Sequence, residues 1–263
     1  NNKHKKENTI PPGKYWKNKT IYLKKIGIEL LPVEKGVFQM GSKEFSFWYK
    51  NPVHEVKLTY GFWIGKTEVT QQQYKKIMKK CPSIFSHPNC PVAKVNWNEA
   101  SEFCKKLTAL EKNKNNLPKG YVFRLPTQAE WEYAAIGGRK TKNYLYSGSN
   151  NIDDVAWYAG NVMPYEKAQP VASKKSNELG IYDMSGNISE WCYDRIYLKF
   201  NKIEINLIGG LNKRNRSCKG GSYFLDENGC RPQNRNPPRI TVRSEVIGFR
   251  IVLATPIKSI IKK

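Results

Sequence analysis

The sequence predicts an α+β domain made of short helices and small antiparallel sheets. Two stretches, 28–42 (IELLPVEKGVFQMGS) and 54–70 (HEVKLTYGFWIGKTEVT), alternate apolar and polar residues around glycines, which is typical of short strands. Three capping sequences, each followed by apolar residues at helical spacing, predict three helices. With 263 residues, of which 39% are hydrophobic and 12% aromatic, the chain is long enough to bury a core.

The chain shows no sign of crossing a membrane by itself. No apolar run approaches the ~20 residues that a transmembrane helix needs. No signal peptide is visible, and we expect any N-terminal lipid anchor to belong to a segment removed before residue 1.

The net charge of +23 is dominated by lysine, and residues 1–25 alone hold eight lysines against one glutamate. A dispersed lysine-rich surface usually serves solubility. The alternative is a patch for an anionic partner, namely an acidic glycan, a membrane or a nucleic acid. Nucleic acid is the weakest of the three, because the basic segments lack aromatic-rich RNA-binding motifs.

Composition divides the chain into a domain between two tails. Residues 1–25 are polar and rich in lysine and asparagine, so we expect a tail or tether there. Residues 26–254 are expected to form one domain, and residues 255–263 a second basic tail. Within the first strands, the positions expected to face the core are Val56, Leu58, Phe62 and Ile64.

The first helix is expected to begin after Thr70, because Gln73 completes a capping box with it. Tyr74, Ile77 and Met78 would form its buried face.

The second helix is expected after Asn96, with Glu99 as its capping partner. The residues at helical spacing that would be buried are Trp97, Ala100, Phe103, Cys104 and Leu107. The third helix is expected to follow Thr127, with Glu130 in the capping position, Trp131 buried and an end at Gly137-Gly138. Glu130 and Glu132 would lie on different faces of that helix, which argues against a catalytic carboxylate pair.

The remaining segments give weaker signals. Residues 139–179 are expected to form a surface excursion. Residues 177–194 (NELGIYDMSGNISEWCYD) combine a glycine-rich turn with a strand. Residues 195–217 carry no pattern that indicates a role.

Six cysteines are present, and no two form a C-x-x-C pair, so the usual zinc and thioredoxin patterns are absent. An even number favours disulfides and an exported location. Cys81 and Cys90 enclose a proline-containing loop that is expected to carry a local bridge. The connectivity of the others is left open by the sequence.

Seven motifs occur in a fixed order: FQMGS, the strand pair ending IGKTEVT, VNWNEASEFC, RLPTQAEWEYAA, NELGIYDMSGNISEWCYD, GGSY and GFR. Together they resemble the formylglycine-generating-enzyme (sulfatase-modifying-factor) family over residues 28–254. The resemblance implies a C-type-lectin-like fold with little regular secondary structure. It also implies disulfides that pair Cys104 with Cys230 and Cys192 with Cys218.

Members of the family that share the SGNISEW motif bind calcium at it. Here the resemblance places the candidate ligands at Asn187, the carbonyl of Ile188 and Glu190, which offer the hard oxygen donors that Ca²⁺ prefers. The alternative is a turn asparagine and a buried, hydrogen-bonded glutamate. Structural Ca²⁺ is thus the one cofactor expected, and none is required.

The family's oxidase activity uses copper held by two cysteines, placed two and seven residues after the tyrosine of GGSY. Thiolates suit Cu(I) because it is a soft cation. Counted from Tyr223, these positions hold Leu225 and Cys230. Leucine cannot ligate a metal. The resemblance therefore implies that the chain has the scaffold of the family but lacks the pair of copper-binding cysteines, and no catalytic residue is expected.

The segment 220–250 is therefore expected to be a display surface. Its frame, CRPQNR and IGFR, resembles the variable region of retroelement-diversified proteins built on this fold, in which adenine-templated codons vary a binding surface. Glu227, Gln233 and Glu245 do not fit the usual variable codons and would be fixed. The expected ligand-facing positions are Tyr223, Phe224, Leu225, Asp226, Asn228, Pro237, Pro238, Arg239, Thr241, Val242, Ser244 and Val246.

These observations lead to one principal hypothesis. The chain is expected to be a non-catalytic, monomeric binding protein for a protein or glycan, exported to the cell surface or periplasm. The alternatives are a divergent copper-dependent oxidase that uses Cys230 with another thiol, and a structural component of a surface assembly.

Overall fold

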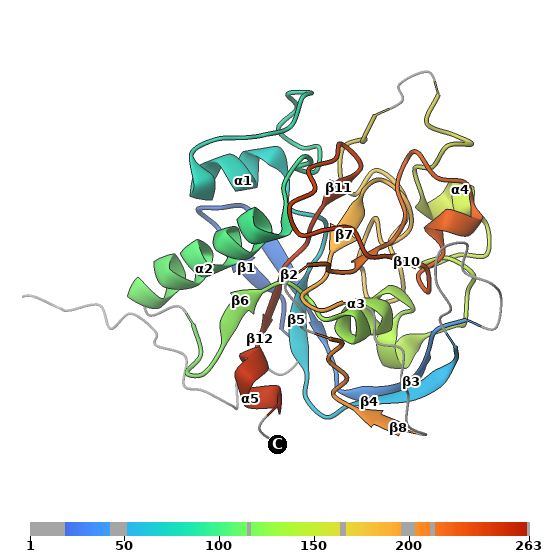
Figure 1. Ribbon diagram of the computed structural model, residues 1–263, viewed down its shortest axis with the longest axis horizontal. Helices are drawn as coiled ribbons and strands as arrows, with labels where there is room; N and C mark the ends of the chain where they lie inside the picture. The colour runs from blue at the N-terminus through green and yellow to red at the C-terminus, as the bar shows by residue number, and fades with distance from the viewer. Residues whose placement is uncertain are drawn as a thin grey trace, which may run out of the picture.

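The computed structural model describes residues 19–42, 52–114, 117–163, 167–195, 203–210 and 214–261. Its main sheet has five antiparallel strands in the order β1 (Ile21–Leu23), β2 (Ile28–Val33), β5 (Phe62–Gly65), β12 (Val252–Ala254) and β6 (Val122–Arg124). The sheet therefore joins the first described strand to one of the last (Figure 1).

Side chains of this sheet alternate between two cores, as the pleat of a strand requires. On β5, Trp63 packs in the core beneath helices α1 (Gln71–Met78) and α2 (Trp97–Asn113), whereas Phe62 and Ile64 pack in the core around α3 (Gln128–Ala135). The expected inward positions Val56, Leu58, Phe62 and Ile64 are all buried. A sheet covered on both faces thus holds the domain together.

The three expected helices are present, and each begins at its capping box. Thr70, Asn96 and Thr127 each accept a hydrogen bond from the backbone N–H three residues later, and the residue there returns one. These local bonds satisfy backbone donors that a helix start leaves unpaired. Each helix start is therefore fixed by four consecutive residues.

Two smaller sheets complete the fold. One has three strands in the order β3 (Gly36–Met40), β4 (His54–Leu58) and β8 (Ile203–Ile205). The other has four, in the order β10 (Arg235–Asn236), β9 (Cys218–Lys219), β7 (Ser189–Trp191) and β11 (Ile247–Gly248). The short elements are η1 (Gly138–Lys140), α4 (Ile152–Val155), η2 (Asn228–Cys230) and α5 (Ile257–Ile261). Short helices and curled sheets of this kind form the C-type-lectin-like α+β fold expected from the sequence.

Several segments expected to be tails or surface loops are part of the packed structure. Residues 1–18 of the expected N-terminal tail lie outside the described residues, but β1 lies within its range and pairs with β2. In the expected C-terminal tail, α5 buries Ile257 and Ile260. In both segments these apolar residues stand beside lysines, so composition alone did not show that the segments pack against the domain.

Residues 139–179, expected to be a surface excursion, and residues 195–217, to which no role was assigned, also contribute to the packed structure. The first contributes α4 and a small core with Tyr146, Ile152 and Cys230. The second contributes β8, which pairs in parallel with β4. Among the described residues, no helix has the length and apolar character required to cross a bilayer.

Candidate ligand-binding surface

The segment 220–250 begins and ends in the four-stranded sheet. Gly220 follows β9, and β11 ends at Gly248, so both ends of the segment are held by strands that flank β7. Gly221 has φ of +72°, and a Cβ there would meet the Gly229 oxygen at 2.6 Å and the Cys230 sulfur at 2.9 Å. Only glycine fits this turn. In Figure 1 the orange-to-red segment crosses the upper face between α4 and β11.

Two buried ion pairs fix these ends. Arg250 donates from Nε and Nη2 to the two carboxylate oxygens of Glu190, each at 2.6 Å, and Trp131 Nε1 donates to Glu190 Oε2 at 2.7 Å. Lys219 donates to Glu132 at 2.8 Å, and both side chains are fully buried. Breaking a buried pair leaves an uncompensated charge, so the ends of the segment are rigidly placed.

The first half of the segment alternates between inward and outward side chains. Tyr223 is buried and Phe224 is 76% exposed. Leu225 turns inward again, onto the small core that contains Cys230, and its carbonyl accepts from Ala159 N–H at 2.9 Å. Asp226 and Asn228 are exposed. Of the expected ligand-facing residues here, Phe224, Asp226 and Asn228 point to solvent, and Tyr223 and Leu225 support them.

The second half runs past the start of α2. The Ile240 carbonyl accepts from Trp97 N–H at 3.1 Å, and the Ser244 carbonyl accepts from Lys94 N–H at 2.9 Å. Arg239 and Thr241 are exposed, whereas Val242 packs partly against the main core. The remaining expected residues are half-buried, namely Pro237, Pro238, Ser244 and Val246.

The two halves meet at a small apolar cluster. Tyr223 packs there with Val162 and Ile188, and Val246 packs against the same group. The cluster therefore brings together residues from both halves, which are far apart along the segment.

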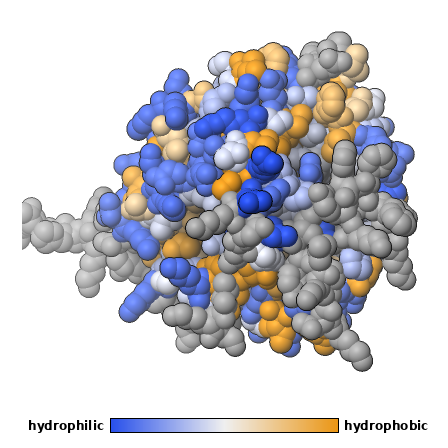
Figure 2. Space-filling view, viewed as in Figure 1, coloured by the Kyte–Doolittle hydropathy of each residue, from blue (hydrophilic) through white to orange (hydrophobic). Residues whose placement is uncertain are grey.

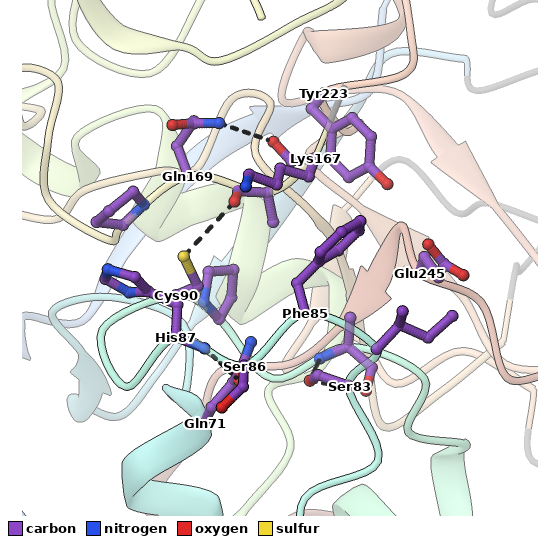
Figure 3. A pocket seen from close by; sticks show the side chains of 15 residues that line it. Gln71, Ser83, Phe85, Ser86, His87, Cys90, Lys167, Gln169, Tyr223 and Glu245 are labelled. Atoms are coloured by element: carbon purple, nitrogen blue, oxygen red, sulfur yellow. Dashed lines mark hydrogen bonds between the residues drawn. The ribbon is translucent and has the colours of Figure 1, made fainter. Parts of the chain in front are cut away.

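A hollow of about 350 Å³ opens beside this cluster, and the sequence did not indicate it. Figure 3 shows its walls: the loop 83–93 after α1, residues 167–170, and Tyr223 and Glu245 from the segment. In this view Phe85 lies between Cys90 and Glu245, with Lys167 Nζ 5.2 Å from the centre of its ring. Pockets of this volume and mostly apolar lining are typical of ligand sites.

Large apolar side chains are exposed around the hollow. Ile84 is 58% exposed and Phe85 is 50% exposed. Figure 2 shows hydrophobic side chains along the upper edge of this face, over the loop that follows α1 and to the right of it. Exposed apolar groups gathered at a hollow are typical of interaction sites.

The copper-binding pair is incomplete in space as well as in sequence. Cys230 is fully buried, its thiol donates to the Ser222 carbonyl at 3.6 Å, and Leu225 packs over the same core. Burial raises the pKa of Cys230 to about 12. The thiolate that Cu(I) requires is therefore disfavoured at the one position where a sulfur is present.

The disulfides expected from the sequence are not formed in this structure, where all six cysteines are free thiols. Cys104 packs in the main core and Cys230 in the separate core near α4. Cys218 pairs with Trp191 across two strands, so Cys192, the next residue, projects to the opposite face of that sheet. The local pair Cys81 and Cys90 is likewise unlinked.

The candidate calcium ligands belong to a buried network. Asn187 Oδ1 accepts from Gln169 N–H at 3.0 Å, and its amide donates to Glu68 at 3.0 Å. Glu190 is occupied by Arg250 and Trp131. In this arrangement Asn187 and Glu190 fit a hydrogen-bond network better than a cation site. No cluster of three or more His, Cys, Asp or Glu suited to a metal occurs in the described part of the chain.

Comparisons with known proteins agree with this architecture. The model of the sulfatase-modifying factor enzyme 1-like domain matches residues 24–255. The chaperone protein LppX of Paenibacillus barcinonensis is 39% identical in an alignment of 206 residues that covers 63% of this chain and 71% of that protein. The formylglycine-generating enzyme of Mus musculus is 28% identical in an alignment of 186 residues that covers 64% of this chain but only 45% of the enzyme. The chain thus spans less than half of that enzyme.

A solved structure, the Treponema denticola variable protein 1, superimposes with a TM-score of 0.78 at 28% identity. The match covers 91% of this chain and 99% of that protein. Since the family model matches nearly all of the described structure, the chain belongs to the family of sulfatase-modifying factor enzyme 1-like domains.

Proposed function

We propose that this protein is a non-catalytic binding protein that holds a polypeptide ligand on the surface formed by residues 223–246 and the adjoining hollow. The observation that carries the proposal is the combination of Leu225 over a buried Cys230 with an exposed Phe224 at a fixed position. The scaffold of the family is present, while one cysteine of its pair is replaced by Leu225 and the other, Cys230, is buried beneath it.

A polypeptide suits this surface better than a glycan, which the sequence left as the other ligand class. Phe224 and Phe85 present exposed aromatic groups, which are enriched at protein interfaces, and Ile84 adds exposed apolar area beside Phe85. The hollow adds room for an inserted side chain, with Lys167 and Glu245 as polar groups at its wall. The similarity to a chaperone and to a variable protein supports binding of other proteins.

An exported location is part of the same proposal and rests on the even number of cysteines. Mass spectrometry of the cytosolic and extracytoplasmic fractions of the native host would test it. The protein is expected in the extracytoplasmic fraction, and recovery from the cytosol alone would contradict export.

The binding site itself can be tested without a known ligand. Peptides selected from a random library against the intact protein would be used as probes, and hydrogen exchange would locate them. Protection is expected in 83–93, 167–170, 223–228 and 237–246. Protection confined to the β3-β4-β8 sheet, or failure to select any peptide, would contradict the proposal.

A further inference from the structure

A second surface, independent of the binding surface, is formed by α1 and the turn between β1 and β2. It carries six exposed lysines, and we call it the basic face: Lys24, Lys25, Lys75, Lys76, Lys79 and Lys80. Figure 2 shows mainly hydrophilic side chains over α1 and α2 in this view.

The two parts of the basic face are in contact. Lys76 Nζ donates to the Ile26 carbonyl at 3.2 Å, and Gln73 Nε2 donates to the Gly27 carbonyl at 2.7 Å. The turn that bears Lys24 and Lys25 therefore lies against α1. The charges of both elements thus act as one patch.

The charge of this patch is not neutralised within the described residues. The ion pairs recorded there involve none of the six lysines, and α1 contains no acidic residue. Two lysines have local roles, since Lys76 holds the turn and Lys79 donates to the Lys76 carbonyl at the end of the helix. The other four, Lys24, Lys25, Lys75 and Lys80, make no recorded side-chain bond to the described part of the chain.

The sequence of residues 1–18 adds five lysines and one glutamate directly before β1. Residue 19 is the point where the described chain begins, and its carbonyl accepts from Trp63 Nε1 at 2.9 Å. The basic N-terminal stretch is thus joined to the hairpin that carries Lys24 and Lys25.

We propose that the basic face docks on the surface of an anionic phospholipid bilayer. Clustered lysines attract anionic headgroups without needing a defined geometry, because each ammonium is a point charge on a flexible stem. Tyr22, exposed on β1 beside Lys24, supplies the kind of aromatic group that is enriched at membrane interfaces. Residues 1–80 contain no arginine, the side chain best suited to fork-like recognition of nucleic acids, which makes a bilayer the better partner.

The test uses the full-length protein and vesicles of phosphatidylcholine with 30 mol% phosphatidylglycerol at low salt. The test variant is K24Q/K25Q/K75Q/K80Q. The matched control is K35Q/K57Q/K140Q/K142Q, which removes the same charge from exposed lysines near β3, β4 and η1. We expect vesicle affinity to fall at least tenfold in the test variant and less than threefold in the control. Pure phosphatidylcholine vesicles should bind neither the wild type nor the variants.

Three results would overturn the proposal. The first is an equal loss of vesicle affinity in both variants, and the second is equal binding of the wild type to pure phosphatidylcholine. The third is binding to a DNA duplex that is tighter than binding to the vesicles and that is lost in the test variant. A second measurement needs no variant. Acetylation of wild-type lysines, with and without vesicles, should show protection of Lys75 and Lys80 but not of Lys35 and Lys57. The reverse pattern, or uniform labelling, would also overturn it.

Discussion

Arg250 and Glu190 form a two-point ion pair in which both side chains are completely excluded from solvent. Arg250 closes the segment 220–250, and Glu190 lies on the central strand β7. The pair therefore couples the end of the binding segment to the middle of the sheet that supports it.

This coupling predicts the effect of a single substitution. Glu190→Gln should lower the free energy of unfolding by about 3–5 kcal/mol, because it removes the charged carboxylate that accepts two hydrogen bonds from the buried Arg250. Urea denaturation at pH 7 measures the change. Glu29→Gln is the matched control, since the pair of Glu29 with Lys66 is partly exposed and should contribute at most ~1 kcal/mol. Equal effects of the two substitutions would refute the role given to Glu190.

The network around Asn187 and Glu190 also predicts the response to calcium. Because protein donors occupy these side chains, the melting temperature should differ by less than about 1 °C between excess Ca²⁺ and excess EGTA. Differential scanning fluorimetry is sufficient for this comparison. A large stabilisation by Ca²⁺ that is lost in Asn187→Ala would instead establish the calcium site.

Two buried carboxyls predict how stability depends on pH. Burial raises the pKa of Asp183 from its usual value near 3.8 to about 6, and burial also raises the pKa of Glu68. A carboxyl whose folded-state pKa is raised contributes stability below its unfolded pKa and loses it as the pH rises through the folded value. The free energy of unfolding should therefore fall between pH 4 and pH 7, with Asp183 contributing on the order of 2 kcal/mol.

Asp183→Asn isolates this contribution. Asparagine keeps an oxygen that can accept from Ala172 N–H, and it tolerates the left-handed backbone of this position, where φ is +58°. Denaturant titrations at pH 4, 5, 6 and 7 should show a flatter dependence for the variant. An unchanged dependence would assign the effect to other groups.

The thiols give a prediction that separates binding from oxidase chemistry. Cys230 is buried and its pKa is raised to about 12, whereas Cys81 is partly exposed. In the native protein, a thiol reagent should modify Cys81 first and Cys230 only on unfolding. A Cu(I) titration should give the same stoichiometry for the wild type and Cys230→Ser. Loss of one equivalent of tightly bound Cu(I) in the variant would revive the oxidase hypothesis.

Features set by neighbouring residues were predictable from the sequence. The capping boxes at Thr70, Asn96 and Thr127 involve contacts over three residues, and all three helices begin there. Seven motifs in order were also sufficient to predict the family, because a fixed sequence of motifs constrains the whole chain.

Features set by distant contacts were not predictable in the same way. The hollow combines Phe85, Lys167, Tyr223 and Glu245, which come from four separate parts of the chain. The orientation of Leu225 was not predictable either, because Tyr223 and Phe224 lie in a turn that the hydrogen bond from Leu225 N–H to the Ser222 carbonyl closes. The pairs Cys104–Cys230 and Cys192–Cys218 were expected from the resemblance, and Cys81–Cys90 from the loop that these residues enclose; none of the three is formed in the structure.

The central claim is that the ligand is held by two exposed aromatic groups, Phe85 at the hollow and Phe224, which follows Tyr223 of the hollow wall. The most direct measurement is the affinity of a library-selected peptide for Phe224→Ala and Phe85→Ala, by fluorescence anisotropy. The controls are Val37→Ala and Ile205→Ala, whose side chains are 52% and 63% exposed on the distant three-stranded sheet. We predict at least about tenfold weaker binding for each aromatic substitution and changes within about twofold for the controls. Unchanged affinity in both aromatic variants would contradict the account.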